Sequence, residues 1–285
     1  MIRKGDEYVF TCPRCQHRKP KLSVNLETDF FHCWVCGFKG QNLAPLLKGE
    51  IKAEYVTELR GTGADKKAPE RKYDEVRLPA EFISLTETPQ SPYYRACIHY
   101  LKRRGIGPEE ILRWKLGYCE EGEYKYRVIV PSFDEYGHLN FFVGRSFYDN
   151  PDTVKYKSGN FCKDIIWNDY QVDWDQPVTL VEGPFDAFKA GDNAIALQGT
   201  ILHDRLLTKI IASGVPVNVA LDADAGDKQF QMMHELLSYG VDCNYVMTYG
   251  RKDLGEMTAE EAKGAIRNAS PVPDVLCLLK YRVMA

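Results

Sequence analysis

The chain has 285 residues, of which 44% are hydrophobic and 27% are charged. This composition, with no apolar run near the roughly 20 residues of a membrane span, excludes a fibrous, membrane-spanning or wholly disordered protein. The first residues are charged and lack the apolar core of a secretory signal, so a cytoplasmic location is expected. A net charge of −3 disfavours a nucleic-acid partner, but a whole-chain average can hide a basic segment.

Charge is distributed unevenly along the chain. Residues 1–48 hold eight Lys and Arg against four Asp and Glu, a net charge of +4. Residues 49–75 are rich in charges of both signs and lack a sustained apolar period, which is typical of a flexible linker. The linker has a net charge of −1, so residues 76–285 carry a net charge of −6. The sequence therefore predicts a small basic unit that a linker separates from a longer acidic one.

Four of the nine cysteines form two CxxC pairs near the N-terminus. Cys12 and Cys15 make one pair, Cys33 and Cys36 make the other, and 17 residues separate the pairs. This spacing is typical of a four-thiolate structural zinc site. A unit of this size buries too little apolar surface to fold unaided, so one zinc ion is expected to supply much of the folding free energy. The other five cysteines, expected to be buried as small apolar groups, are Cys97, Cys119, Cys162, Cys243 and Cys277.

The surface of this basic unit is expected to carry its function, because a closed four-thiolate site is structural. Its basic residues interleave with aromatic ones, as in proteins that bind single-stranded nucleic acid. Alternatively, about half of the aromatic residues pack the core and the basic residues form a merely solvated face. Neither His17 nor His32 is expected to bind the metal. The interleaved residues are Arg14, Arg18, Lys19, Lys21, Lys39, Phe30, Phe31, Trp34 and Phe38.

After the linker, residues 93–117 predict two helices separated by a break at 105–108. Pro108 suits the first turn of the second helix. Residues 124–148 are rich in β-branched and aromatic side chains, with a turn at 134–137, which indicates a β-hairpin.

From residue 178 onward, short apolar runs alternate with helical segments. This alternation predicts βαβ units on a parallel sheet. Thr258 and Glu261 form a capping box at the start of the last helix. The expected strands are 178–181, 194–197, 217–222 and 244–248, and the expected helices begin at Phe185, His203, Ala225 and Thr258.

Acidic residues follow two of these strands. Glu182 comes after the first strand, and Asp222 and Asp224 come after the third. The carboxyl ends of parallel strands meet at one sheet edge, where clustered acids are typical of Mg²⁺ or Mn²⁺ binding. On an extended segment Asp222 and Asp224 would point the same way. Alternatively, the two are ordinary solvated loop acids.

The acidic positions belong to a longer series of short motifs. The series is Glu182-Gly-x-x-Asp186, Gln198-Gly199-Thr200, Asp222-x-Asp224-x-Gly226 and Lys252-Asp253. It resembles the Toprim domain of DnaG-type primases, topoisomerases and some nucleases. Upstream segments narrow the resemblance to the DnaG-type primases. Those segments are Phe31 to Gly37, Arg103 to Ile106, Arg127 to Pro131, Gly144-Arg145, Lys155 to Lys157 and Phe161 to Lys163.

The resemblance implies an α/β protein, α+β overall. It comprises a small β zinc ribbon, a mixed α+β N-terminal subdomain and a Toprim subdomain with a parallel sheet. The expected segments are a zinc-ribbon template-recognition domain (1–48), a flexible linker (49–75), the N-terminal subdomain of the RNA polymerase domain (76–172), and the Toprim catalytic subdomain with a tail (173–285).

The resemblance also implies an activity, that of a DNA primase, which is a DNA-directed RNA polymerase and nucleotidyltransferase. Such an enzyme makes short RNA primers on single-stranded DNA from ribonucleoside triphosphates for DNA replication. The implied catalytic residues are Glu182, Asp222 and Asp224; Asp186 and Asp253 join them in holding Mg²⁺ or Mn²⁺, and two ions are expected. The implied template or nucleotide contacts are Arg127, Arg145, Lys155 and Lys163.

No phosphate-binding GxxxxGK[ST] loop occurs, and the chain is too short for the helicase-docking domain of bacterial primases. A minimal phage-type or plasmid-type primase with a separate replicative helicase is therefore expected, in the cytoplasm of a bacterial host if a phage encodes it.

Three positions depart from the family pattern. Cys15 stands where many bacterial members have His, Phe142-Val143-Gly144 replaces the paired glycines, and Gly255 replaces a second acid, so it cannot be a side-chain ligand. Two other functions stay open: a Toprim-type nuclease or topoisomerase fragment, and a catalytically idle zinc-ribbon DNA-binding adaptor.

Overall fold

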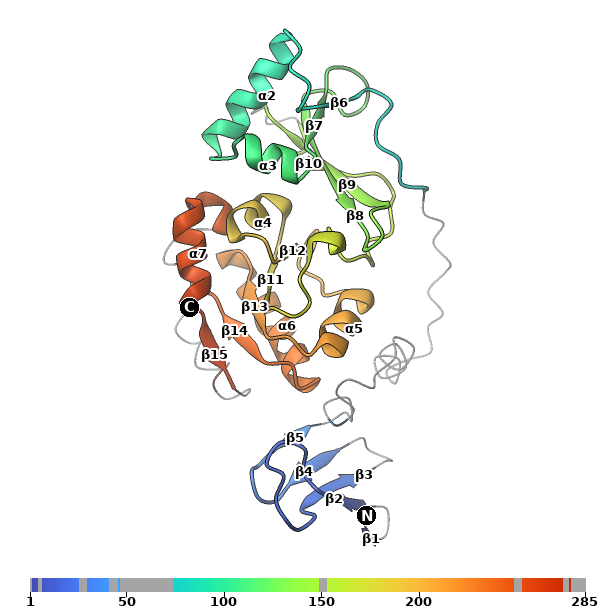
Figure 1. The fold of residues 1–285 in the computed structure, drawn as a ribbon, viewed down its shortest axis with the longest axis vertical. Coiled ribbons are helices and arrows are strands. Elements are labelled where there is room, and N and C mark those ends of the chain that lie inside the picture. The colour runs from blue at the N-terminus through green and yellow to red at the C-terminus, as the bar shows by residue number, and fades with distance from the viewer. Residues whose placement is uncertain are drawn as a thin grey trace.

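The computed structural model describes residues 2–4, 7–25, 30–40, 46, 74–148, 153–248, 253–273 and 277 (Figure 1). Side chains are described for these residues except 2–4, 7 and 224. The predicted linker at 49–75 lies outside the described residues except at its last two positions. The described strands form three five-stranded sheets, and none of the described helices is long and apolar enough to cross a membrane.

The first sheet is an antiparallel meander in the order β1-β2-β3-β4-β5. Leu22 and Val24 of β3 and Phe31 of β4 face inward and are buried, as the two-residue period of a strand requires. Phe38 packs on Phe31 with 4.8 Å between ring centroids, whereas Trp34 is 71% exposed. The expectation that about half of the aromatic residues pack inside is therefore confirmed. The strands are Ile2–Lys4, Glu7–Phe10, Leu22–Asn25, Phe31–Cys33 and Lys39–Gly40.

The second sheet, in the order β10-β9-β8-β7-β6, is also antiparallel and carries the helices α2 (Pro92–Arg103) and α3 (Pro108–Arg113). The Ser91 hydroxyl caps α2 by accepting the Tyr93 N–H at 3.0 Å. Both predicted helices and the predicted hairpin, now β8 and β9, are confirmed. The strands are Phe82–Ser84, Gly117–Cys119, Arg127–Phe133, Leu139–Ser146 and Tyr156–Lys157.

The third sheet, in the order β12-β11-β13-β14-β15, is parallel in its first four strands. The predicted alternation of strands and helices is confirmed, and the Thr258 hydroxyl accepts the Glu261 N–H as the capping box requires. The edge strand β15 is antiparallel and was not predicted. The elements are β11 Val178–Val181, α4 Pro184–Ala190, β12 Ala194–Ala196, α5 Asp204–Ser213, β13 Val217–Ala220, α6 Gly226–Ser238, β14 Cys243–Tyr245, α7 Ala259–Arg267 and β15 Ser270–Val272.

The prediction of an extended segment through Asp222 and Asp224 is wrong. Strand β13 ends at Ala220, and Ala223–Ala225 form a 3₁₀ turn, η3. The Ala225 N–H donates to the Asp222 carbonyl oxygen at 2.9 Å. Side chains on such a turn do not alternate between two faces, so the argument that the two acids point the same way does not hold.

The scattered cysteines follow the prediction in part. Cys97, Cys119 and Cys243 are buried as expected. Cys162 and Cys277 are only half-buried, so the prediction of burial holds for these two only in part.

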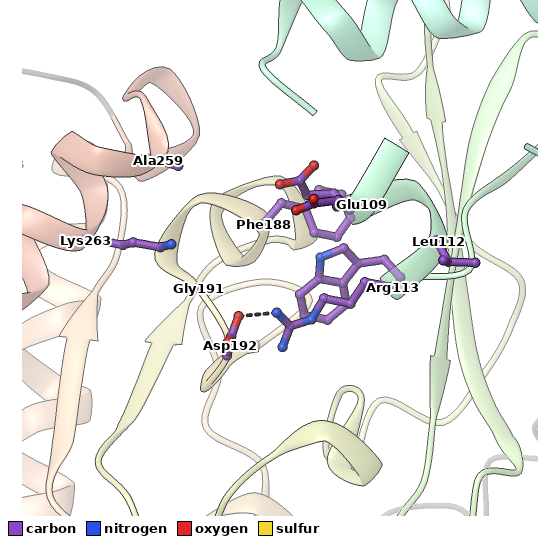
Figure 2. A pocket seen from close by; sticks show the side chains of 10 residues that line it. Glu109, Leu112, Arg113, Phe188, Gly191, Asp192, Ala259 and Lys263 are labelled. Carbon is purple, nitrogen blue, oxygen red and sulfur yellow. Dashed lines mark hydrogen bonds and ion pairs between the residues drawn. The ribbon is translucent and has the colours of Figure 1, made fainter. Parts of the chain in front are cut away.

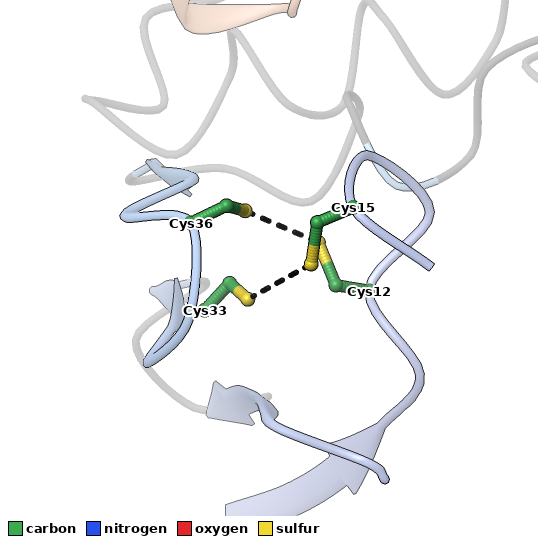
Figure 3. Close-up of side chains that lie close together, drawn as sticks. All are labelled: Cys12, Cys15, Cys33 and Cys36. Atoms are coloured by element: carbon green, nitrogen blue, oxygen red, sulfur yellow. Dashed lines mark hydrogen bonds between the residues drawn. The ribbon is translucent and has the colours of Figure 1, made fainter. Parts of the chain in front are cut away.

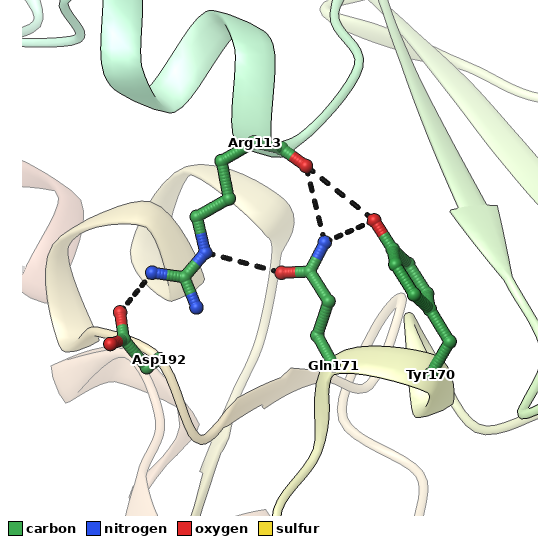
Figure 4. A network of polar contacts seen from close by, with 4 residues as sticks. All are labelled: Arg113, Tyr170, Gln171 and Asp192. Atoms are coloured by element: carbon green, nitrogen blue, oxygen red, sulfur yellow. Dashed lines mark hydrogen bonds and ion pairs between the residues drawn. The ribbon is translucent and has the colours of Figure 1, made fainter.

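The second and third sheets share one continuous apolar core. Trp114, which follows α3, stacks on Trp167 with 5.0 Å between the ring centroids, and its ring centroid lies 5.2 Å from that of Phe188 in α4. A polar clasp lies beside this core (Figure 4): Arg113 pairs with Asp192 and donates from Nε to Gln171 Oε1 at 3.2 Å. An exposed ion pair contributes about 0–1 kcal/mol, so apolar burial, rather than the clasp, mainly holds the two sheets together.

Candidate metal centres

The four cysteines of the N-terminal unit converge (Figure 3). Their Sγ atoms all lie within 4.8 Å of one another, with Cys12 3.7 Å from Cys36 and Cys15 3.8 Å from Cys33. A tetrahedral ion with Zn–S bonds of about 2.3 Å places its sulfur atoms about 3.8 Å apart. Gly37, with a φ of 71°, turns the chain back after the second pair, and its N–H donates to the Cys33 carbonyl oxygen at 3.0 Å. The donor set therefore fits a structural zinc ion.

Without metal, the thiols titrate very differently from one another. Burial raises the pKa of Cys33, but hydrogen bonds from the backbone of Cys36 and Val35 and from neighbouring thiols lower it to about 6. Burial and hydrogen bonds with the other three thiols raise the pKa of Cys36 to about 12. Zinc must displace the protons that remain, so metal binding by this cluster releases protons.

The predicted catalytic acids stand at one edge of the third sheet. Val181 at the end of β11 pairs with Ala220 at the end of β13, so Glu182 and Asp222 leave neighbouring parallel strands. The chain continues from β11 to β12 on one side and from β13 to β14 on the other. Such a reversal of strand order opens a crevice for ligands at the carboxyl ends of the strands. The side chain of Asp224 lies outside the described part of the chain.

Asp186, in the first turn of helix α4, and Asp253, which precedes the 3₁₀ turn Leu254–Glu256, reach the same edge. The Asp186 carboxylate accepts the Gly183 N–H and the Gly255 N–H, each at 3.0 Å. Burial raises its pKa to about 6, and the charges of Asp253 and Glu182 act in the same direction against the two backbone hydrogen bonds. Asp186, Asp253 and Glu182 are therefore electrostatic neighbours. Among the described side chains, only the four cysteines gather tightly enough to surround a single ion.

The predicted basic contacts differ in exposure. Arg127 is buried and donates to the carbonyl oxygens of Val154 at 2.7 Å and Lys155 at 3.3 Å. Lys155 and Lys163 are exposed, and Lys163 Nζ donates to the Gln198 carbonyl oxygen at 3.3 Å. Lys163 therefore lies beside the loop after β12, at the edge that carries the acids.

Arg145 is also buried, in an aromatic setting that the sequence did not reveal. Its guanidinium donates to the hydroxyls of Tyr100 and Tyr156 and lies 4.7 Å from the ring centroid of Phe185, the residue before Asp186. Burial raises the pKa of Tyr156 to about 12 despite the opposing charge of Arg145, and the nearby charge of Asp186 also raises it. Tyr100 lies seven residues after Tyr93 on α2, and no sequence signal distinguishes it from other aromatic residues.

A cavity of about 440 Å³ lies elsewhere, at the far end of α4 (Figure 2). Its lining includes Leu112 and Arg113 of α3, Asp192 after α4 and Lys263 of α7. Glu182 and Asp186 stand at the opposite end of α4. The carboxyl ends of β11 and β13, together with Glu182, Asp186, Asp222 and Asp253, are called the acidic edge below. The cavity is separate from this edge.

Known proteins resemble the chain in both of its parts. Residues 1–68 match the family described as the CHC2 zinc finger of DnaG. The DNA primase of Lactococcus lactis is 23% identical over 79% of this chain and 44% of the relative, and that of Legionella pneumophila is 21% identical over 95% of this chain and 57% of the relative. The chain thus spans about half the length of the curated relatives that it matches.

Solved structures share the fold. The zinc-binding and RNA polymerase domains of Aquifex aeolicus primase cover 95% of this chain and 81% of that structure, with a TM-score of 0.53 and 20% identity. A DnaG primase catalytic domain bound to single-stranded DNA covers 68% of this chain and 77% of that structure, with a TM-score of 0.56 and 19% identity. The chain therefore shares the fold of the zinc-binding and RNA polymerase domains in these structures. The resemblance to DnaG-type DNA primases, predicted from the motifs, is confirmed.

Proposed function

We propose that this protein is a DNA primase that makes short RNA primers on single-stranded DNA from ribonucleoside triphosphates, for DNA replication. The observation that carries the proposal is the acidic edge. Glu182 and Asp222 leave neighbouring parallel strands, and Lys163 reaches the adjacent loop. The chain's similarity to the Lactococcus lactis and Legionella pneumophila DNA primases supports the same activity. A separate replicative helicase, a bacterial cytoplasmic setting and the four-segment division given above belong to this proposal.

Two divalent ions, Mg²⁺ or Mn²⁺, would be held at the acidic edge by Glu182, Asp222, Asp224 and Asp253, with Asp186 beside them. Carboxylate oxygens are the ligands that both ions prefer. When bound, such ions neutralise charge on a triphosphate and orient the attacking and leaving oxygens. Lys155 and Lys163, which are exposed, would contact phosphate groups of template or nucleotide. Arg127 would position Lys155 by donating to the Lys155 carbonyl oxygen. Arg145 would orient Tyr156 by donating to the Tyr156 hydroxyl.

The zinc ribbon would bind the template through the outer face of its sheet. His32 on β4 pairs with Ser23 on one side and Lys39 on the other, so the three side chains form a row across the strands. The Trp34 ring lies 4.4 Å from the His32 ring and is largely exposed. An exposed indole beside a lysine suits base stacking and phosphate contact on one strand. The DnaG catalytic domain that was solved with single-stranded DNA supports this class of partner for the rest of the chain, not for the ribbon itself.

One experiment separates the three candidate functions. The full chain is incubated with single-stranded DNA of varied sequence, Mg²⁺ and labelled ribonucleoside triphosphates. New template-dependent oligoribonucleotides support the primase. Shortened DNA without RNA synthesis indicates the nuclease, and DNA binding with neither product indicates the adaptor, so either result contradicts the proposal.

Trp34→Ala is expected to weaken binding of single-stranded DNA by the full chain about 5-fold to 160-fold, because one stacked base contributes roughly 1–3 kcal/mol. Zinc content is expected to stay at that of the wild type, since the exposed indole makes no part of the ribbon core. Fluorescence anisotropy with a labelled oligonucleotide measures the affinity. The matched control is Tyr136→Ala, which removes an exposed aromatic ring from the turn between β8 and β9 and should leave the affinity unchanged.

Binding of Mn²⁺ to the acidic edge is expected to weaken as the pH falls from 7 to 5.5, because the pKa of Asp186 is raised to about 6. The folded-state pKa lies above that of an unfolded aspartate. This carboxyl therefore stabilises the metal-free fold below about pH 4 and loses that contribution as the pH rises through 6. The gain in Tm on adding Mn²⁺ should consequently grow between pH 5 and pH 7. If the gain in Tm on adding Mn²⁺ did not change between pH 5 and pH 7, the placing of Asp186 beside the bound ions would be contradicted.

A further inference from the structure

Asp186 joins two segments that are far apart in the sequence. Its Oδ2 accepts the N–H of Gly183, the residue that precedes α4, as a capping-box side chain does. Its Oδ1 accepts the N–H of Gly255, 69 residues later, in the 3₁₀ turn η4 (Leu254–Glu256). One carboxylate therefore fastens this turn to the start of α4, and both of its oxygens lie against backbone amides.

Gly255 is the residue that permits this contact. A Cβ atom added there would lie 2.7 Å from Asp186 Oδ1 and 3.2 Å from Asp253 Oδ1. The first distance is shorter than real Cβ contacts, so any side chain at 255 would force Asp186 or the turn to move. The residue that departs from the family's acidic pattern is thus the one whose backbone binds a neighbouring acid.

Asp253 begins the same turn. Its Oδ1 accepts the Glu256 N–H at 2.8 Å, which fixes the orientation of its carboxylate relative to the turn. A Cβ atom added at Gly255 would lie within 3.2 Å of an Oδ1 of both Asp186 and Asp253, so the two carboxylates are close. Where the turn sits therefore decides where the Asp253 carboxylate sits.

We propose that Asp186 is a positioning residue. Through the Gly255 N–H it holds η4 against α4 and so delivers Asp253 to the acidic edge, where Glu182, Asp222, Asp224 and Asp253 hold the ions. In this chain the turn has no acidic side chain at position 255, and the Gly255 N–H binds Asp186 instead. The inference rests on the proposed function only for the task of Asp253; the contact itself does not depend on that function.

The first test is amide hydrogen exchange of the full chain, followed by mass spectrometry, without nucleotide or DNA and in a buffer free of Mg²⁺ and Mn²⁺. Asp186→Ala is expected to accelerate exchange in residues 253–257 at least tenfold. Gly255→Ala should do the same, and the double variant should exchange no faster than the faster single one, because both changes break one contact. Asp222→Ala, the matched control, should leave this segment unchanged. Unchanged protection in Asp186→Ala, with β11 and β13 still protected, overturns the proposal.

The second test is the Mn²⁺ affinity, measured by electron paramagnetic resonance. Asp186→Ala and Asp253→Ala are each expected to weaken binding about tenfold, the lower end of the range for residues that orient a ligand. The double variant is expected to be no weaker than Asp253→Ala alone. A further tenfold loss in the double variant would make Asp186 a ligand, and no loss in Asp186→Ala would make it purely structural; either result overturns the inference. A wild-type chain that makes no primers would overturn the proposed function and leave the exchange result standing.

Discussion

Replacing Asp222 with asparagine is expected to abolish primer synthesis, with a loss of at least 100-fold, while the fold stays intact. Asp222 follows β13 at the edge where Glu182 leaves the neighbouring strand. Removing its negative charge lowers the affinity for divalent ions and leaves charge on the triphosphate without its counterion. The backbone contact that starts η3 uses the carbonyl oxygen of Asp222, which the substitution retains.

The measurement is the yield of labelled oligoribonucleotides on single-stranded DNA with Mg²⁺, together with the Tm in the absence of Mg²⁺. The Tm of the variant should equal or exceed that of the wild type, because one of several like charges is removed. Asp242→Asn is the matched control: Asp242 is exposed and precedes β14, at the opposite end of the strands from the acids, so it should retain full activity. Full activity in Asp222→Asn would remove this residue from the catalytic site.

Elements that are buried on both faces were predictable to within a residue or two. The apolar runs at 178–181 and 194–197 became β11 and β12, because parallel strands covered by helices are continuously apolar. The start of α7 was equally clear, since the capping box of Thr258 and Glu261 depends only on local spacing. Sequence patterns predict these elements because burial on both faces of a strand, or the local spacing of a helix cap, determines them directly.

The course of the chain after β13 was not predictable by the same means. Alternating acids suggested an extended segment, yet the chain turns within one residue of Asp222. Ala223 and Ala225, on either side of Asp224, favour helical backbone over strand. This preference prevails because the pairing of β13 with β11 ends at Ala220. Spacing alone therefore placed the acids at the correct edge but gave the wrong local geometry.

Contacts between residues far apart in the chain could not be predicted from the sequence. The absence of an acid at Gly255 was visible, but its hydrogen bond to Asp186 depends on how α4 and η4 pack. Likewise, Arg145 could be assigned to a strand, whereas its burial between Tyr156 and Phe185 follows from the packing of the second sheet on the third. Such contacts join residues that are far apart in the sequence, and no helical or strand periodicity relates their positions.

The zinc site gives the second large effect: Cys33→Ser is expected to remove the zinc and unfold the ribbon while the second and third sheets stay folded. The buried cluster of the ribbon consists of Leu22, Val24 and Phe31 with two of the cysteines themselves. So small a core cannot offset the conformational entropy of the chain, whereas structural zinc supplies an apparent 10–16 kcal/mol or so of binding free energy in small zinc domains. The rest of the protein has its own continuous core and does not depend on the metal.

Zinc content is measured by atomic absorption, and local folding by hydrogen exchange in residues 7–25 and 30–40. The variant should fall from one zinc per chain to near none, and exchange in the ribbon should approach that of an unfolded peptide. Cys162→Ser is the matched control, because this half-buried thiol lies outside the cluster and should leave zinc content and exchange unchanged. Primer synthesis on single-stranded DNA should be lost with the ribbon. His32 and Lys39 lie side by side, with the exposed Trp34 ring against His32, only when β4 and β5 are paired. A Cys33→Ser protein that kept its zinc and a protected ribbon would show that three thiolates suffice. The ribbon's stability would then have to come from apolar packing that the buried cluster among its described residues does not provide.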